Sequence, residues 1–195
     1  MKCHADSFAS DSGGIALSAT KLRRFHPSVF GLSGLLQSVA SSIRFRNIVH
    51  VQTELREHLM YGDSRAAIVV SLSPLLVAAY TDELDCVVML GFPDELVTEY
   101  ELVRHSRLLT TNTYNYLEPR QADLSEGPAS LGRYGFFWPV IAEFLTDDLA
   151  RANQRKLEID EDEWRRTIEC ANEYIAKYKH MVRDGRPYRS WIPAF

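Results

Sequence analysis

Residues 65–92, RAAIVVSLSPLLVAAYTDELDCVVMLGF, contain three consecutive segments that are rich in apolar and β-branched residues. Ser73 and Pro74 separate the first segment from the second, and TDELD, residues 81–85, separates the second from the third. Short apolar runs bounded by turn residues are typical of β-strands, and a loop of three to five residues between two of them is typical of an antiparallel hairpin. This stretch therefore predicts the centre of a mixed or antiparallel sheet.

The second loop of this stretch carries three carboxylates, Asp82, Glu83 and Asp85. Aspartate is favoured in turns because its side chain bonds to nearby backbone N–H groups. The same carboxylates would suit a hard cation such as Mg²⁺ or Ca²⁺, or a general base. The stretch lacks the alternating acidic ligands, central glycine and closing glutamate of a calcium loop. We therefore interpret it as a hairpin turn, and we keep a site as the alternative.

The flanking sequence adds further elements on both sides of the three strands. IVHV, residues 48–51, predicts a short strand, and residues 53–62 predict a helix that Thr53 caps and Gly62 ends. Pro93 precedes a short acidic helix, and residues 107–116, rich in Thr and Tyr, predict a fourth strand.

Two helices are expected at the C-terminal end of the chain. Pro139 suits the first position of a helix, and the stripe of Ile141, Phe144, Leu145, Leu149 and Ala152 has helical spacing. The last helix has a capping-box-like start at Asp160 and Glu163 and a stop at Gly185. We therefore predict an α+β domain over residues 47–195, with about four strands packed against two C-terminal helices.

Residues 118–134 form a polar segment with two prolines, Pro119 and Pro128, and two glycines, Gly127 and Gly132, and this segment predicts a long loop. Loops of this length are uncommon in a compact domain unless they bind a ligand or move. The sequence leaves open whether this loop is a lid.

Residues 1–46 differ from the rest of the chain in composition. Residues 1–24 are rich in Ser, Gly and Ala and predict a flexible leader. An amphipathic helical extension is expected to follow, and its apolar stripe consists of Leu32, Leu35, Leu36, Val39 and Ile43. Such a helix can dock on a partner, on a membrane surface or on its own domain. A basic, serine-rich start also permits an organelle transit peptide, although Asp6 and Asp11 argue against it.

The C-terminal segment RDGRPYRSWIPAF, residues 183–195, combines arginines with Tyr188 and Trp191. Aromatic and arginine side chains are enriched where proteins bind partners. The alternative is that this segment folds back and packs on its own domain. Together with the apolar stripe of residues 32–43, Tyr188 and Trp191 are our candidate partner-binding residues.

The composition excludes several classes of protein. No run of about 18 apolar residues predicts a membrane span, and three widely spaced cysteines do not form a disulfide framework. We expect a soluble, cytoplasmic protein. Five basic and no acidic residues lie between residues 12 and 53, but the chain has a formal charge of −4, so a nucleic-acid partner is not expected.

Motifs for catalysis and cofactor binding are also missing from the sequence. It has no G-x-S-x-G nucleophile motif and no glycine-rich phosphate loop, and its six histidines have no zinc-ligand spacing. No cofactor and no metal are therefore expected. His105, in VRHSRLL, would act as a base only beside an acidic partner.

These patterns favour a non-catalytic protein-interaction module, such as an inhibitor, an immunity-type protein or a subunit of an assembly, that binds a protein partner or self-associates. The alternative is a small hydrolase-like or metal-assisted enzyme. Its site would combine Asp82, Glu83 and Asp85 with His105 beneath the loop of residues 118–134.

Overall fold

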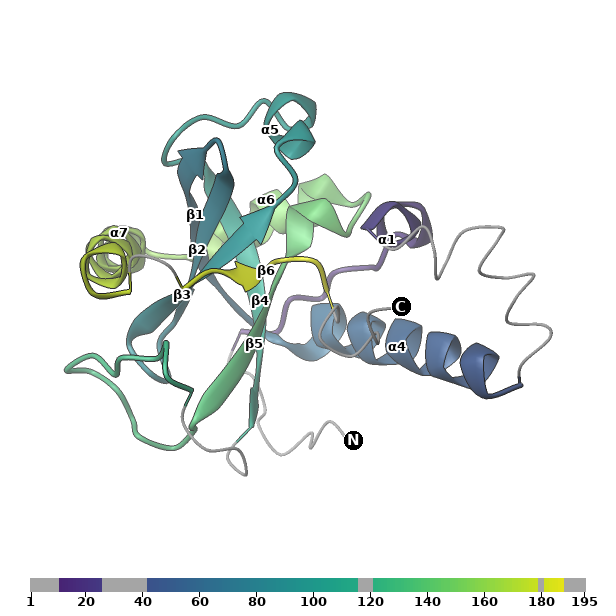
Figure 1. The fold of residues 1–195 in the computed structure, drawn as a ribbon, viewed down its shortest axis with the longest axis horizontal. Helices are drawn as coiled ribbons and strands as arrows, with labels where there is room; N and C mark the ends of the chain where they lie inside the picture. The colour runs from purple at the N-terminus through teal and green to yellow at the C-terminus, as the bar shows by residue number, and fades with distance from the viewer. Residues whose placement is uncertain (1–10, 26–41, 116–120, 179–180, 188–195) are drawn as a thin grey trace.

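The computed structural model describes residues 11–25, 42–115, 121–178 and 181–187, and no side chains between residues 42 and 48. Six strands form one curled sheet in the order β5-β4-β1-β2-β3-β6 (Figure 1). The strands are β1 (Asp63–Leu72), β2 (Leu75–Thr81), β3 (Cys86–Phe92), β4 (Arg107–Asn115), β5 (Phe136–Ile141) and β6 (Arg183–Asp184). All neighbours are antiparallel except β3 and β6, which are parallel. The mixed α+β architecture agrees with the prediction, but the sheet has six strands in the described residues rather than about four.

The central strands lie where the sequence of residues 65–92 predicts them. Strand β2 pairs with β1 on one side and β3 on the other, with Ala79 opposite Ala67 and Val88. Both faces of these strands are covered, which explains why their sequence is nearly continuously apolar rather than alternating. Ala67 and Val69 of β1 face one core, and Ala66 and Ile68 face the other.

Five α-helices and one short 3-10 helix accompany the sheet in the described residues. They are α1 (Ala19–Phe25), α4 (Ser42–Tyr61), α5 (Glu95–Glu99), η1 (Ala142–Phe144), α6 (Leu149–Glu158) and α7 (Glu161–Lys177). Helix α7 covers the outer face of β1, β2 and β3, where it packs Trp164, Cys170 and Tyr174 (Figure 1). None of the described helices is long and apolar enough to cross a membrane.

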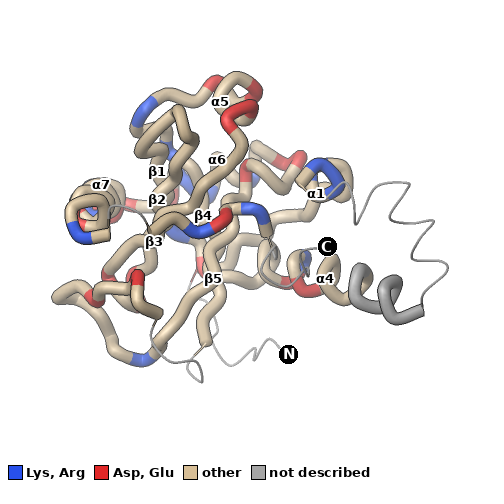
Figure 2. Tube along the Cα trace, in the orientation of Figure 1, with Lys and Arg blue, Asp and Glu red and all other residues tan. Residues whose placement is uncertain are grey.

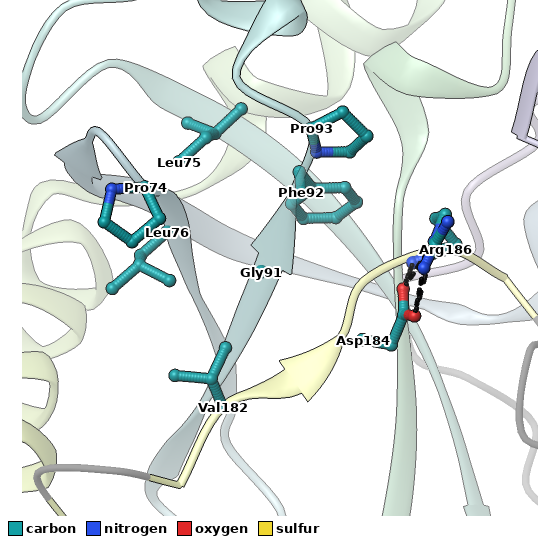
Figure 3. Close-up of a pocket in the computed structure, with 9 residues that line it drawn as sticks. All are labelled: Pro74, Leu75, Leu76, Gly91, Phe92, Pro93, Val182, Asp184 and Arg186. Carbon is teal, nitrogen blue, oxygen red and sulfur yellow. Dashed lines mark hydrogen bonds and ion pairs between the residues drawn. The ribbon is translucent and has the colours of Figure 1, made fainter.

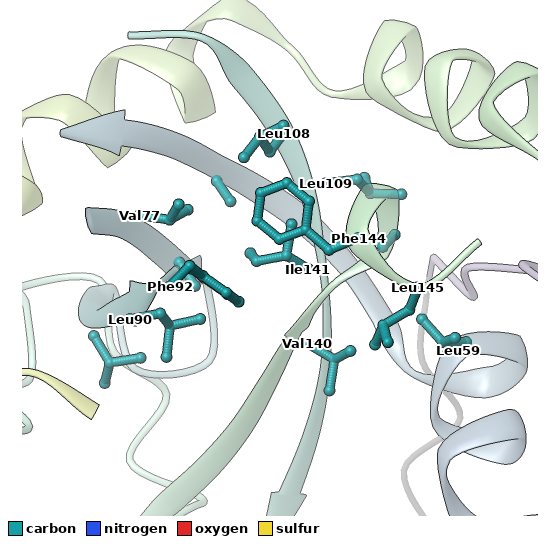
Figure 4. Packing of buried hydrophobic residues seen from close by; sticks show 14 of the residues in the cluster. Leu59, Val77, Leu90, Phe92, Leu108, Leu109, Val140, Ile141, Phe144 and Leu145 are labelled. Atoms are coloured by element: carbon teal, nitrogen blue, oxygen red, sulfur yellow. The ribbon is translucent and has the colours of Figure 1, made fainter. Parts of the chain in front are cut away.

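The inner face of the sheet encloses the larger core (Figure 4). Phe92 and Phe144 meet edge to face there, with ring centroids 4.9 Å apart. Leu55 and Leu59 from the last turns of α4 close one end of this core. The first half of α4 extends beyond the sheet (Figure 1).

Two predicted elements have a different secondary structure. Residues 48–51, predicted as a strand, belong to helix α4, because the helix continues through IVHV toward Gly62. Residues 139–141, predicted as the start of a helix, belong to β5. Pro139 is tolerated because β5 is an edge strand, so the backbone on its outer side has no neighbouring strand to which it must donate hydrogen bonds. Helix α6 starts instead at Leu149, after Asp148 accepts a hydrogen bond from the Arg151 N–H.

The last helix starts as predicted and ends early. The Asp160 side chain accepts a hydrogen bond from the Glu163 N–H at 2.7 Å. Helix α7 ends at Lys177, and residues 183–184 form β6 instead of continuing to Gly185. A Cβ on Gly185 would lie 2.3 Å from the Phe92 ring, so glycine lets the chain pass close to the end of β3.

Residues 11–24, predicted as part of a flexible leader, are packed against the body together with Phe25. Ile15, Leu22 and Phe25 are buried in the inner core. The Gly13 N–H donates to the Gly62 carbonyl at 3.0 Å. A Cβ on Gly13 would approach the Leu59 carbonyl oxygen to 2.5 Å, so glycine permits this contact. Burial of three large apolar residues therefore outweighs the polar character of the segment.

Candidate functional site

The three acidic residues of the β2–β3 loop lie at a hairpin turn, and each pairs with a different arginine. Asp82 lies 2.6 Å from Nη2 of Arg65, and Glu83 lies 2.5 Å from Nη2 of Arg133. Asp85 accepts hydrogen bonds from Nε and Nη2 of Arg166 at 2.8 and 3.1 Å. The three carboxylates are therefore directed to three different parts of the chain rather than to one cation.

Asp85 is the best satisfied of these carboxylates. Besides Arg166, it accepts hydrogen bonds from the Tyr80 hydroxyl at 3.0 Å and from the Ala129 N–H at 3.1 Å. Burial acts to raise the pKa of Asp85, but the hydrogen bonds from Arg166, Ala129 and Tyr80 outweigh burial and lower it. Such a carboxylate is a stable anion that holds α7 and the following loop, and it is a weak proton acceptor.

His105 lies away from the hairpin turn. Its backbone N–H donates to the Val69 carbonyl at 2.8 Å, and its side chain is exposed at a turn with φ of 66°. Val69 lies four positions along β1 from Arg65, the partner of Asp82, and this corresponds to about 13 Å along the strand. The structure therefore does not bring His105 together with Asp82.

The buried histidine of the described chain is His58, on α4. Its Nε2 lies 2.8 Å from the Thr111 carbonyl oxygen. Burial lowers the pKa of His58 to about 4, so the ring is neutral at physiological pH and fastens the helix to β4. Within the described ranges, no three His, Cys, Asp or Glu side chains are arranged to hold a metal ion.

The loop of residues 118–134 is described from residue 121 onward and packs on the hairpin turn. The Gly127 N–H donates to the Leu84 carbonyl at 3.0 Å, and the Leu131 N–H donates to the Glu83 carbonyl at 3.1 Å. Asp123 also accepts two hydrogen bonds from Arg183, at 2.6 and 2.8 Å. These contacts tie the loop to the turn and to β6.

A charged cluster at the start of β1 was not predicted. We define the Arg65 cluster as Asp11, Asp63, Arg65, Asp82 and Glu163. Asp63 and Arg65 are two residues apart on a strand and therefore share a face, which is a sequence signal for their pairing. Arg65 Nε lies 2.9 Å from Asp63 Oδ2, and Arg65 is itself buried. The other carboxylates come from distant segments, which no local pattern reveals.

The opposite end of the strands carries an apolar groove of about 640 Å³ (Figure 3). We define the edge groove as the depression lined by residues 74–76 and 91–93 with Val182, Asp184 and Arg186. Leu76 of β2 is paired with Gly91 of β3, and Val182, on the segment before β6, lies beside Gly91 as well. Asp184 and Arg186 form an ion pair at 2.7 Å at one end, and basic and acidic residues alternate along this segment (Figure 2).

The predicted partner-binding residues lie outside the described part of the chain or have no described side chain. Leu32, Leu35, Leu36, Val39, Tyr188 and Trp191 lie outside the described residues. Ile43 belongs to helix α4, but its side chain is not described. Their role in binding stays a prediction.

Comparison of the chain with protein-family models, curated proteins and solved structures found no match.

Proposed function

We propose that the protein is a non-catalytic protein-interaction module that binds an extended, apolar segment of a protein partner in the edge groove. The observation that carries this proposal is an uncovered apolar area on a sheet whose two faces are otherwise packed.

The groove continues the outer face of the sheet beyond helix α7. Leu76 and Gly91 follow the same alternation as Ala78 and Met89, so all four point to the outer face. Helix α7 packs over Ala78 and Met89, which are buried. Leu76 and Gly91 are only half-buried.

The apolar surface extends from the sheet onto the segment before β6. Val182 is 47% exposed and Met181 is 40% exposed. Contiguous exposed apolar surface of this kind is typical of partner-binding sites. The exposure of Met181 and Val182 beside the edge groove therefore favours a partner-binding surface at this place.

The chemistry of the lining favours a peptide segment over a small polar metabolite. Small-molecule sites combine an apolar wall with a few polar groups that orient the ligand. Here the charged pair in the lining, Asp184 and Arg186, is joined by hydrogen bonds at 2.7 and 2.9 Å. A partner with apolar side chains and no charge at the contact suits this neutralised lining.

The backbone geometry favours an extended segment. The groove lies where β2 and β3 end side by side, with Leu76 opposite Gly91, and where β6 pairs with β3 over only two residues. An extended peptide presents every second side chain to one face. One such side chain could rest on Gly91, which has no side chain of its own, and contact Leu76 and Val182 beside it.

The proposal is tested with a peptide library displayed on phage, selected against the full chain. We expect enrichment of peptides with alternating apolar residues. In Val182→Asp, their affinity falls at least about ten-fold, because a charge enters an apolar contact.

Val49→Asp is the matched control, since Val49 is 45% exposed on α4. It leaves the affinity unchanged if the edge groove is the binding site. A loss in Val49→Asp with no loss in Val182→Asp would overturn the groove and favour α4.

Self-association through the same groove has a separate signature. The full chain would then show a concentration-dependent increase in mass by light scattering, and Val182→Asp would abolish that increase. A truncated chain starting at Asn47 is unsuitable for this test, because it would remove Ile15, Leu22 and Phe25 from the core.

The alternative proposal, an enzyme that uses Asp82, Glu83, Asp85 and His105, receives less support. The three carboxylates pair with Arg65, Arg133 and Arg166, and His105 lies at the other end of β1. Catalysis by these groups would need a rearrangement of those pairs.

A further inference from the structure

The Arg65 cluster contains more negative than positive charge. Arg65 Nη1 lies 3.1 Å from Asp11 Oδ2, Nε lies 2.9 Å from Asp63 Oδ2, and Nη2 lies 2.6 Å from Asp82 Oδ2. A fourth carboxylate, that of Glu163, lies 4.0 Å from Nη1. One guanidinium therefore faces four carboxylates, and a second cation, Arg155, reaches only the outermost of them, Asp11, at 3.6 Å.

Two oxygen atoms of the cluster lack donors. Asp63 Oδ1 and Asp82 Oδ1 are inaccessible to solvent and accept no hydrogen bond from the described residues. The Asp63 side chain is only 6% exposed. A buried, ionised carboxylate with an unmatched oxygen is costly, whereas a proton removes the charge and converts an acceptor into a donor.

We propose that the Arg65 cluster is a proton-binding site in which Asp63 gains and loses a proton close to neutral pH, and that loss of this proton loosens residues 11–15 and the β2–β3 turn from the sheet. A proton neutralises the buried Asp63 carboxylate without requiring room for a second cation. It also relieves the repulsion between Asp63 and the neighbouring carboxylates.

The groups around Asp63 come from every adjoining element. Arg65 on β1 and the Tyr114 hydroxyl on β4, which donates to Asp63 Oδ2 at 3.2 Å, stabilise the anion. Asp82 and Asp11 oppose it, and burial opposes it most strongly, so the pKa of Asp63 rises to about 7. From α7, Glu163 also faces the cluster, and burial raises its pKa although it accepts a hydrogen bond from the Ala66 N–H.

The cluster holds the N-terminal segment by its backbone as well as by Asp11. The Ser64 N–H donates to the Asp11 carbonyl at 2.8 Å, and Ser12 forms a β-bridge with Asp63. Ionisation of Asp63 places a new negative charge beside this bridge and beside Asp82. Both attached segments are therefore expected to open more often once the proton leaves.

The experiment uses the full chain and two measurements. Carboxyl-carbon NMR follows the titration of Asp63, and hydrogen exchange, corrected for the intrinsic pH dependence, follows residues 11–15 and 82–85. We expect Asp63 to titrate near neutrality, and protection of both segments to fall about ten-fold between pH 6 and pH 8.5. Asp63→Asn, a neutral isostere, is expected to keep the protection constant over this range.

Two further variants identify the proton carrier. Asp82→Asn removes a like charge and lowers the midpoint of the Asp63 titration, whereas Glu163→Gln preserves the protection change if Asp63 carries the proton. The proposal is overturned if Asp63 titrates below pH 5 in the unaltered chain. It is also overturned if Asp63→Asn retains the pH dependence, or if Glu163→Gln abolishes it.

Discussion

The two ends of the central strands use opposite chemistry. At the end formed by Asp63 and Thr81, the charged side chains of Asp63 and Arg65 are buried and paired, and the partly exposed Asp82 also pairs with Arg65. At the end formed by Leu75 and Phe92, the lining is apolar and partly exposed in the edge groove. Ion pairs between distant segments fasten the chain to itself, whereas uncovered apolar surface gains free energy only when another molecule covers it. This contrast separates a structural end from a candidate binding end.

The largest effect is expected from removing the central cation of the cluster. Arg65→Met removes the guanidinium that faces Asp63, Asp82 and Asp11, and it should lower the free energy of unfolding by about 3–5 kcal/mol, because these carboxylates are left together without their shared cation. Urea denaturation at pH 7 measures the change. Arg104→Met, at an exposed arginine, is the control and should change stability by less than about 0.5 kcal/mol. Equal free energies of unfolding for the two variants would show that the Arg65 cluster does not stabilise the fold.

Gly13 at the charged end and Gly91 at the edge groove allow the steric tolerance of the two ends to be compared. A Cβ on Gly13 would lie 2.5 Å from the Leu59 carbonyl oxygen and 3.0 Å from Thr111 Cγ2. Gly13→Ala should therefore destabilise the protein by about 1–3 kcal/mol, because backbone must move. Thermal unfolding followed by circular dichroism measures this loss, and a neutral result would show that residues 11–15 are not held against α4.

The pH dependence of stability sharpens the comparison at the charged end. Because the pKa of Asp63 is raised from 3.8 to about 7, the folded protein binds more protons than the unfolded chain in this interval. Its contribution to stability is complete below about pH 4 and is lost as the pH rises to about 7, by up to about 1.4 kcal/mol per pH unit. The difference in unfolding free energy between the unaltered chain and Asp63→Asn, measured from pH 4 to pH 8, isolates this contribution. A difference that is independent of pH would contradict it.

Asp85 should have the opposite dependence. Its pKa is lowered in the folded protein, so the stability that it contributes is present above pH 3.8 and is lost as the pH falls through the lower, folded value. Asp85→Asn should therefore lose more stability at pH 7 than at pH 3. Denaturation at these two pH values measures the change, and equal losses at both would argue against an ionised Asp85.

The smallest effect on stability is expected at the groove. A Cβ on Gly91 would meet Val182 Cγ1 at 3.0 Å, and that side chain is exposed and able to move. Gly91→Ala should change the free energy of unfolding by less than about 0.5 kcal/mol. Thermal unfolding followed by circular dichroism measures the change in Gly91→Ala and in Gly13→Ala under the same conditions. A loss as large as that of Gly13→Ala would mean that the groove is a rigid part of the core.

Much of the sheet could be predicted from the sequence, because the signal is local. The apolar runs of residues 65–92 and the acidic loop between them specify strands and a turn by their own composition. Strand β5 could not be predicted, because Pro139 starts helices and also occurs on edge strands, and only its pairing with β4 distinguishes these cases. The packing of Ile15 and Leu22 has no periodic pattern and was therefore missed.

The candidate sites were less accessible to prediction than the fold. The carboxylates of residues 82–85 are visible in the sequence, but their partners Arg65, Arg133 and Arg166 are separated from them by up to 81 positions. The edge groove combines the ends of β2 and β3 with the segment around Val182, and no local pattern connects these segments.

By itself, the sequence determined the central strands, the hairpin turn, the start of α7 and the overall α+β class. These features depend on periodicity, capping and turn propensity, which act between neighbouring residues. Only the tertiary structure decided which charges meet at Arg65 and which apolar residues stay uncovered. Both depend on contacts between distant segments, because electrostatic energy and burial are set by position in space rather than by order along the chain.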